Sequence, residues 1–170
     1  MSSQSPFYTV RHAEERDIPV LLRLLEQISR LHHAGRPDLF HVGTKYTADE
    51  LRALLRDAAY VVLVAAPDGG EAVGYALCEL QEAVHGHVLV PHRTLYLDDL
   101  CVDASHRGRG VGRCLMEAVK EVARQEECYH LTLNVWACNP QAEAFYRRHG
   151  LLPQKTCMEW VVPASSEGGF

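Results

Sequence analysis

The chain has 170 residues, of which 47% are hydrophobic, and a formal net charge of −5 at pH 7. This length and apolar content predict one domain over residues 1–170, with a core at about residues 7–162 and a flexible tail at residues 163–170. The acidic balance argues against a nucleic-acid-binding surface, and no stretch approaches the roughly 20 apolar residues of a membrane-spanning helix.

The first half of the chain predicts a strand, two helices and a hairpin. Asp17 as an N-cap, with Pro19 in the first turn, begins the first helix. The second helix begins at the capping box Thr47–Glu50. The expected strands are Phe7–Arg11, Tyr60–Ala66 and Glu71–Glu82, the last two joined by a Pro-Asp-Gly-Gly turn.

The second half predicts three strands and two helices. After a polar loop, Val84–Arg93, the expected strands are Leu95–Val102, Leu131–Trp136 and Thr156–Val162. The expected helices are Val111–Arg124 and a segment that begins at Asn139–Pro140 and ends at Gly150. The order β-α-α-β-β-β-α-β-α-β predicts a mixed α/β fold with hairpins first and crossovers later.

A glycine-rich loop lies between the fourth predicted strand and the helix that follows it. Residues 107–112 read Arg-Gly-Arg-Gly-Val-Gly, and Arg107, Arg109 and Arg113 add positive charge. Glycine lets a ligand approach the backbone, and amides at a helix N-terminus attract phosphate oxygens. No Gly-Lys-Ser/Thr follows, and the spacing differs from the dinucleotide fingerprint. The loop predicts a phosphate-bearing ligand.

Two motifs make the chain resemble the GNAT-type N-acetyltransferases, which transfer an acetyl group from acetyl-CoA to an amine. The family's Arg/Gln-x-x-Gly-x-Gly/Ala loop is matched by Arg107, Gly110 and Gly112. Its Asn-x-x-Ala-x-x-Phe-Tyr-x-x-x-Gly segment is matched by Asn139, Ala142, Phe145, Tyr146 and Gly150. The resemblance covers about residues 7–162 and implies an acyl-CoA N-acyltransferase-like fold. In that fold a twisted, mostly antiparallel sheet is splayed at the cofactor site and flanked by helices on both faces.

The resemblance implies acetyl-CoA as co-substrate and no metal. The loop amides would hold the pyrophosphate, and the preceding strand would pair with pantetheine. A backbone amide near Leu100 or Cys101 would stabilise the oxyanion. The cofactor-binding residues expected on this basis are Leu100, Cys101, Val102, Arg107, Gly108, Arg109, Gly110, Val111, Gly112, Arg113, Asn139 and Tyr146.

Direct attack by an amine calls for a base and for an acid that protonates the leaving thiolate. Tyr146 occupies the family's tyrosine position and is the expected acid; alternatively, it packs on the cofactor and its hydroxyl is structural. Two adjacent carboxylates, Asp98 and Asp99, interrupt an apolar strand. A charge there is costly unless it is solvated or paired, so at least one should face a wet cleft.

Strand alternation assigns the two carboxylates to opposite faces of the sheet. It groups Asp98 with Tyr96, Leu100 and Val102, and Asp99 with Leu95, Leu97 and Cys101. The stretch resembles the Tyr-Leu-Glu-Asp strand of diamine and polyamine acetyltransferases, which implies that Asp98 is the base or the amine anchor. Asp99 is expected to pair with backbone amides or a neighbouring arginine. A bulge near Leu97 would shift this phase by one residue.

The expected function is transfer of an acetyl group to a primary amine, either a small cationic molecule or an amino group of a peptide or protein. A catalytically silent acetyl-CoA-binding regulatory module and another phosphate-ligand binder are the alternatives. The family also makes a homodimer possible. His85, His87 and His92 are expected to be surface residues rather than metal ligands. Six scattered cysteines and an N-terminus without signal-peptide features predict a cytoplasmic protein.

Overall fold

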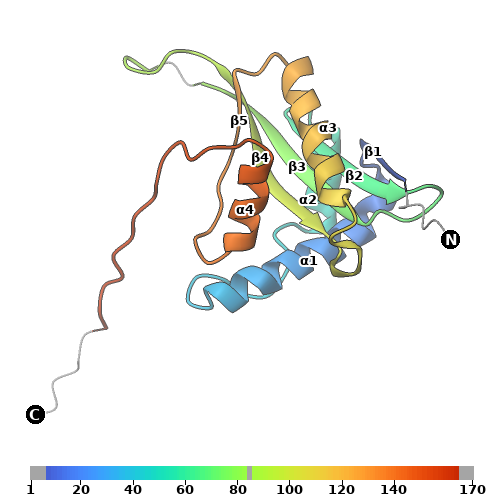
Figure 1. Cartoon of the computed structure of the whole chain (residues 1–170), viewed down its shortest axis with the longest axis horizontal. Coiled ribbons are helices and arrows are strands. Elements are labelled where there is room, and N and C mark those ends of the chain that lie inside the picture. Colours follow the sequence, from blue (N-terminus) through green and yellow to red (C-terminus); the bar gives the residue numbers. More distant parts are fainter. Residues whose placement is uncertain (1–6, 84–85, 165–170) are drawn as a thin grey trace, which may run out of the picture.

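A computed structural model of the chain describes residues 7–83 and 86–164 (Figure 1). Within these residues five strands form one sheet in the order β1-β2-β3-β4-β5, antiparallel throughout except that β4 and β5 are parallel. The strands are β1 (Tyr8–His12), β2 (Tyr60–Pro67), β3 (Gly74–Glu82), β4 (Arg93–Val102) and β5 (His130–Leu133). The helices are α1 (Ile18–Gly35), α2 (Ala48–Arg56), α3 (Val111–Gln125) and α4 (Pro140–Arg148), with 3-10 turns at Glu15–Asp17 and Ala104–His106.

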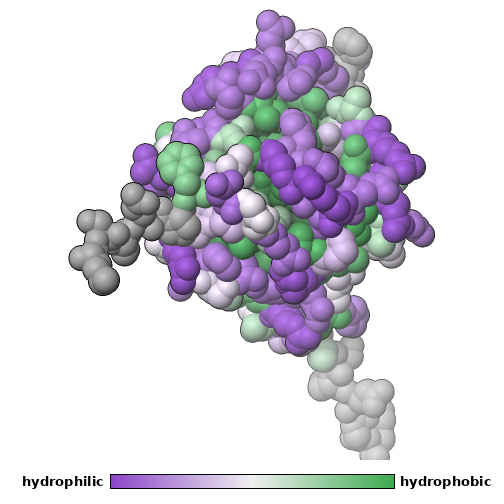
Figure 2. Space-filling view, turned by 90° about the vertical axis from the view of Figure 1, so that its right-hand side faces the viewer, coloured by the Kyte–Doolittle hydropathy of each residue, from purple (hydrophilic) through white to green (hydrophobic). Residues whose placement is uncertain are grey.

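Helices cover both faces of the sheet, which confirms the predicted mixed α/β architecture (Figure 1). Alternating strand residues divide the core into two layers: Leu63 packs with α3 and α4, whereas Val62 packs with α1 and α2. On the face seen in Figure 2 hydrophilic side chains predominate, with apolar areas between them. Apolar burial in these two layers is what holds the helices on the sheet.

Local capping explains where the first two helices begin. The predicted capping box of α2 is present, because Thr47 Oγ1 accepts from Glu50 N at 3.2 Å and Thr47 N donates to Glu50 Oε2 at 2.7 Å. Asp17 precedes α1, but its carboxylate accepts no capping bond from that helix. It accepts instead from the Arg11 guanidinium at 2.7 and 2.9 Å, so β1 and α1 are joined by a partly buried ion pair.

A β-bulge at Asp98 changes the phase of β4. Leu97 pairs with Cys78 and Asp99 pairs with Leu77, so Asp98 faces no residue of β3. Before the bulge Leu97 belongs to the α3-side core; after it Cys101 belongs to the α1-side core. The predicted strict alternation is therefore wrong: the extra residue brings Asp98 and Asp99 to the same, α1-side layer.

The C-terminal part of the sheet departs from the prediction. β5 ends at Leu133 instead of Trp136. The predicted strand Thr156–Val162 is not formed: residues 151–164 have no regular secondary structure and lead away from the body (Figure 1). A strand requires a partner for its amides and carbonyls, and this segment has none within residues 7–83 and 86–164. Residues 165–170, the end of the expected flexible tail, lie outside the described residues.

Candidate functional site

The glycine-rich loop ends in an open helix N-terminus. Gly110 is the N-cap of α3, and Gly108 and Gly110 have φ values of 73° and 86°, in the region that favours glycine. No atom lies within 4 Å of a Cβ built at either residue, so the space above them is free. The first turn of α3 contains no acidic residue, which leaves the helix amides available to an anion.

Gly112 has a different structural reason to be glycine. A Cβ at this position would lie 3.1 Å from Cε2 of the Phe145 ring, closer than side chains normally pack. The glycine thus permits α4 to lie directly against the start of α3. Since Phe145 belongs to the Asn139–Gly150 motif, the two motifs recognised in the sequence meet at this contact.

Three arginines surround the loop, and all are exposed. None of Arg107, Arg109 and Arg113 forms a salt bridge with a carboxylate in the part of the chain that the structure describes. Arg107 Nε lies 3.4 Å from the carbonyl oxygen of Val102, which places its guanidinium at the end of β4. Unpaired guanidinium groups beside free helix amides suit a phosphate or pyrophosphate.

The end of β4 is open on one side. Its pairing with β5 stops at Leu97, whereas β4 itself continues to Val102 and keeps its pairing with β3. The β5-side edge of residues 98–102 therefore has no strand partner among the described residues. This is the splay expected from the fold, and it leads directly to the glycine-rich loop.

Gln27 of α1 fixes this end of β4, and no sequence motif indicated it. Its Nε2 donates to the Val102 carbonyl at 3.0 Å, and its Oε1 accepts from Ala104 N at 3.1 Å. Nε2 also lies 3.3 Å from Cys101 Sγ. Burial raises the pKa of the Cys101 thiol to about 12, so this side chain is a neutral core group and only its backbone can serve a ligand.

The side chains of other residues expected to bind the cofactor pack in the core or cap a helix. The Val111 side chain is buried in the α3-side core, and Leu100 packs against the same core, so their backbone groups are what a ligand could reach. Asn139 caps α4, because its Oδ1 accepts from Ala142 N at 3.2 Å. Its Nδ2 donates to no residue in the described ranges.

Tyr146 projects from α4 into the α3-side core and is half-buried. Burial, together with the nearby Asp99 carboxylate, raises the pKa of its phenol above the usual range. The side chain is therefore a neutral proton carrier. Its hydroxyl makes no hydrogen bond to another residue within 7–83 and 86–164, and so it is available to a ligand.

Asp98 forms an ion pair with the ammonium group of Lys45. Lys45 Nζ donates to both of its carboxylate oxygens at 2.7 Å, and the Tyr46 hydroxyl donates to Oδ2 at 2.9 Å. The Asp98 side chain is 16% exposed and that of Lys45 is 50% exposed, so solvent reaches this pair from the lysine side. Lys45 and Tyr46, which precede α2, were not identified from the sequence because they belong to no motif.

Asp99 has a different environment: its side-chain partner is a tyrosine rather than an arginine, and the backbone of Leu100 supplies the expected amide contact. The hydroxyl of the fully buried Tyr75 donates to Asp99 Oδ2 at 2.8 Å. Burial raises the pKa of Asp99 to about 6, with the neighbouring Asp98 acting in the same direction. A carboxylate with this pKa is ionised at neutral pH and can readily accept a proton.

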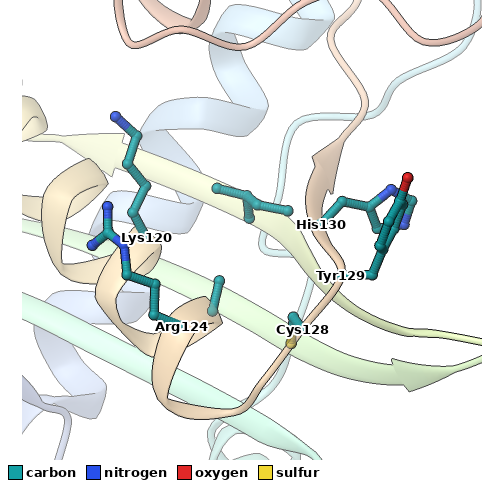
Figure 3. A pocket seen from close by; sticks show the side chains of 7 residues that line it. Lys120, Arg124, Cys128, Tyr129 and His130 are labelled. Atoms are coloured by element: carbon teal, nitrogen blue, oxygen red, sulfur yellow. The ribbon is translucent and has the colours of Figure 1, made fainter.

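The remaining sequence candidates lie apart from this site. His85 lies outside the described residues, and His92 Nδ1 is 2.7 Å from Val90 O. In the described ranges no cluster of three potential metal-ligating side chains occurs. An open pocket between the C-terminal half of α3 and the start of β5 lies at the opposite end of α3 from Gly110 (Figure 3). Among the described helices, none combines the length and apolar character needed to cross a membrane.

Comparison with known proteins identifies relatives over most of the chain. Residues 25–151 match the acetyltransferase (GNAT) family. Glucosamine 6-phosphate N-acetyltransferase 1 of Oryza sativa subsp. japonica is 30% identical, over 89% of this chain and 85% of the relative. Thialysine N-epsilon-acetyltransferase of Bos taurus is 28% identical, over 85% and 84%. A mutant protein from Bacillus halodurans has a similar crystal structure, with a TM-score of 0.88 and 27% identity over 91% of this chain and 99% of that one.

Proposed function

The chain is an acetyltransferase of the GNAT family, and on that premise we propose that it transfers the acetyl group of acetyl-CoA directly to a primary amine. The observation that carries the proposal is the ion pair between Asp98 and the ammonium group of Lys45, which lies beside the open end of β4. The names of the rice and bovine relatives specify acetylation at nitrogen, which supports an amine acceptor.

Acetyl-CoA fits the open end of the sheet. Its pyrophosphate would be held by the amides at the start of α3 and by Arg107, Arg109 and Arg113, which have no carboxylate partner among the described residues. Its pantetheine would run along the unpaired edge of residues 98–102. The thioester supplies the acetyl carbon, and a backbone amide near Leu100 or Cys101 would donate to the developing oxyanion.

The acceptor would bind on the α1-side layer, where Asp98 anchors its ammonium. On this proposal, the ammonium group of Lys45 occupies the position that the ammonium group of the acceptor would take. It has to leave when the acceptor binds. An anionic anchor and an overall charge of −5 favour a small cationic amine over a neutral one. Amino groups of peptides that carry further positive charge are the second class of acceptor.

Two side chains carry out the proton transfers of the proposed reaction. Asp99, with its pKa of about 6, takes a proton from the bound ammonium, directly or through water, and the freed nitrogen attacks the carbonyl carbon. When the C–S bond breaks, Tyr146 gives its proton to the leaving thiolate and regains one, directly or through water, from the acylated nitrogen, which must lose its second proton to become a neutral amide. Asp98 serves as the anchor, oriented by the hydrogen bond from the Tyr46 hydroxyl. This assignment moves the role of base from Asp98 to its neighbour.

A panel of amines tests the proposal. Polyamines, diamines, amino acids with basic side chains, amino sugars and lysine-containing peptides are each incubated with acetyl-CoA, and the released CoA thiol is measured. We expect amine-dependent release that is fastest for a small cationic amine. Binding of acetyl-CoA without release for any amine would instead support a silent regulatory module.

The free thiols support a proposal about the compartment. All six cysteines are free in the structure. We propose that the protein works in the cytoplasm, where thiols stay reduced.

A further inference from the structure

Lys45 is one of three lysines in the chain, with Lys120 and Lys155. It precedes α2, and its Nζ donates to both carboxylate oxygens of Asp98 at 2.7 Å. The same Nζ lies 5.5 Å from the centre of the Tyr46 ring. A carboxylate together with an aromatic ring attracts a cationic amine. The amine of Lys45 is therefore held in the way expected of an amine substrate.

The proposed base is also within electrostatic reach of Lys45. Burial raises the pKa of Asp99 to about 6, and the positive charge of Lys45 acts in the opposite direction. Asp98 and Asp99 lie in the same, α1-side layer, at the start of the open β5-side edge of residues 98–102 along which the cofactor is proposed to lie. The anchor, the base and a lysine amine thus meet in one place.

The other two lysines have different surroundings. Lys120 lies in the C-terminal half of α3, where its Nζ is 3.0 Å from Glu117 Oε1, and it lines the pocket shown in Figure 3. Lys155 is exposed and lines an open pocket beside β5. Among the described residues, neither forms an ion pair with a carboxylate of β4. Of the three lysines, Lys45 alone has the surroundings of a substrate.

We infer that Lys45 is a site of self-acetylation: without an amine acceptor, the protein transfers the acetyl group of acetyl-CoA to Lys45 Nζ. The inference rests on the proposed function, because it uses the same cofactor site and the same base. Asp99 takes one proton from the Lys45 ammonium, and the freed nitrogen forms a bond to the acetyl carbon. The C–S bond breaks, and the thiolate takes a proton from Tyr146, which recovers one from the acylated nitrogen. The products are N-acetyl-lysine, CoA with a free thiol, and one proton that Asp99 releases to water.

The lysine side chain is free to turn toward the cofactor. Its four-carbon stem is flexible, and the side chain is 50% exposed, so little packing is lost when it moves. Asp98 itself belongs to the unpaired segment 98–102, so the amine only has to turn from the carboxylate toward the adjacent edge of β4. Because the amine, the base and the bound thioester belong to one molecule, the transfer should occur within a single chain.

Acetylation changes the acceptor site. An N-acetyl-lysine is neutral, so it cannot keep the ion pair with Asp98 and leaves that carboxylate to an amine acceptor. It is also an amide, which is a poor acetyl donor, so the modification ends at one acetyl group per chain and is not an intermediate of transfer to the amine. Since an added amine competes with Lys45 for Asp98, self-acetylation should be fastest when the acceptor is scarce.

Peptide mapping by mass spectrometry tests the site. The purified full chain is treated with a lysine deacetylase, which is then removed, and is incubated with acetyl-CoA in a buffer without amines. We expect Lys45 to reach one acetyl group per chain, at least about 100-fold faster than Lys155, the lower limit for the contribution of a positioned base. Lys155 is the internal control, because it is exposed and reports spontaneous acetylation. Equal rates at the two lysines would overturn the inference.

Two variants separate catalysed from spontaneous acetylation. Asp98→Asn should slow acetylation of Lys45 by roughly ten- to hundred-fold, as expected when a charge-assisted contact is lost, and should leave Lys155 unchanged. Asp68→Asn, in the exposed β2–β3 turn, is the matched control and should change neither rate. A lysine that reacts only because it is exposed does not depend on Asp98, so an unchanged rate at Lys45 in a folded Asp98→Asn protein would contradict self-acetylation. Circular dichroism checks the folding of both variants.

The order of the reaction and the amine panel complete the test. A rate constant that is independent of protein concentration supports transfer within one chain, whereas one that rises in proportion to it contradicts such transfer. If an amine of the panel is acetylated and Lys45 is not, the inference fails while the proposed function stands. If Lys45 is acetylated and no amine of the panel is, self-acetylation stands and the proposed class of acceptor fails.

Discussion

Asp98 and Asp99 are adjacent in the chain, yet they differ in every property that decides a catalytic role. The bulge brings both to the α1-side layer, where Asp98 binds Lys45 and Tyr46 and Asp99 binds Tyr75. A carboxylate that accepts two hydrogen bonds from an ammonium group has the geometry of an amine anchor. A carboxylate whose pKa burial raises to about 6 is a good base at neutral pH.

Asp99→Asn tests this division through pH. The pKa of Asp99, about 6, lies above the value of 3.8 for a free carboxyl group, so the folded state binds this proton more tightly than the unfolded state. The free energy of unfolding should then fall as the pH rises between these values, and Asn cannot titrate. Relative to the unmodified protein, Asp99→Asn should be more stable at about pH 7.5 than at about pH 4. Denaturant titrations at both pH values measure this.

The same variant should lose turnover. The low-pH limb of kcat/KM, expected near pH 6, should disappear in Asp99→Asn, while acetyl-CoA binding remains. Asp98→Asn should keep that limb and raise KM for the amine by roughly ten- to hundred-fold, because a charge-assisted contact worth about 1.5–3 kcal/mol is lost. The opposite assignment of the two effects would return the role of base to Asp98.

Lys45→Met tests the stand-in role of the lysine. An exposed ion pair is worth about 0.2–1 kcal/mol, so freeing Asp98 should lower KM for the amine by up to about five-fold. Arg52→Met is the control, since Arg52 forms an exposed ion pair with Asp49 on α2 and should leave KM unchanged. A rise in KM for Lys45→Met would mean that the lysine itself contacts the acceptor.

Tyr146→Phe separates chemistry from packing. The ring remains in place, and only the unpaired hydroxyl is lost. We expect kcat to fall by roughly 10²–10⁴-fold, the usual contribution of a general acid, with little change in the affinity for acetyl-CoA. Stopped-flow measurement of the chemical step is the appropriate readout. An unchanged rate of that step would leave Tyr146 with a packing role only.

At the scale of elements, the N-terminus of α3 carries the cofactor side of the site. Gly110→Glu introduces a negative charge where the pyrophosphate would lie, as well as a side chain in left-handed backbone. Gly69→Glu is a matched control, because Gly69 also has a positive φ (67°) and free space around it, but lies in the β2–β3 turn.

Both variants should lose a similar amount of stability, on the order of 1–2 kcal/mol for a residue held in left-handed backbone. Only Gly110→Glu should abolish the rise in melting temperature that acetyl-CoA produces. Equal stabilisation of both variants by acetyl-CoA would place the pyrophosphate elsewhere.

Elements with local signals were predictable from the sequence. The capping box fixed the start of α2, and the glycine loop fixed the start of α3. A bulge near Leu97 was an open alternative to strict alternation, but residues 95–102 form one continuous run with no local signal that decides between the two. Gln27 and Lys45 were missed for another reason: their partners lie 75 and 53 positions away, and such contacts exist only once the sheet is formed.

At the scale of the whole molecule, the last predicted strand shows that an alternating sequence pattern alone does not establish a strand. The alternation in Thr156–Val162 predicted a strand that the structure does not form, because a strand needs a partner edge and this segment pairs with none among the described residues.

The most direct test of the central claim follows the acetyl group itself. The protein is incubated with acetyl-CoA labelled with ¹³C in the acetyl group and with the best amine of the panel, and mass spectrometry measures the label on the amine, on CoA and on the protein. We expect one labelled acetyl group on nitrogen for each CoA thiol released, and no labelled protein intermediate. Release of CoA without labelled amine, or passage of the label through an acetylated side chain on the way to the amine, would contradict direct transfer at this site.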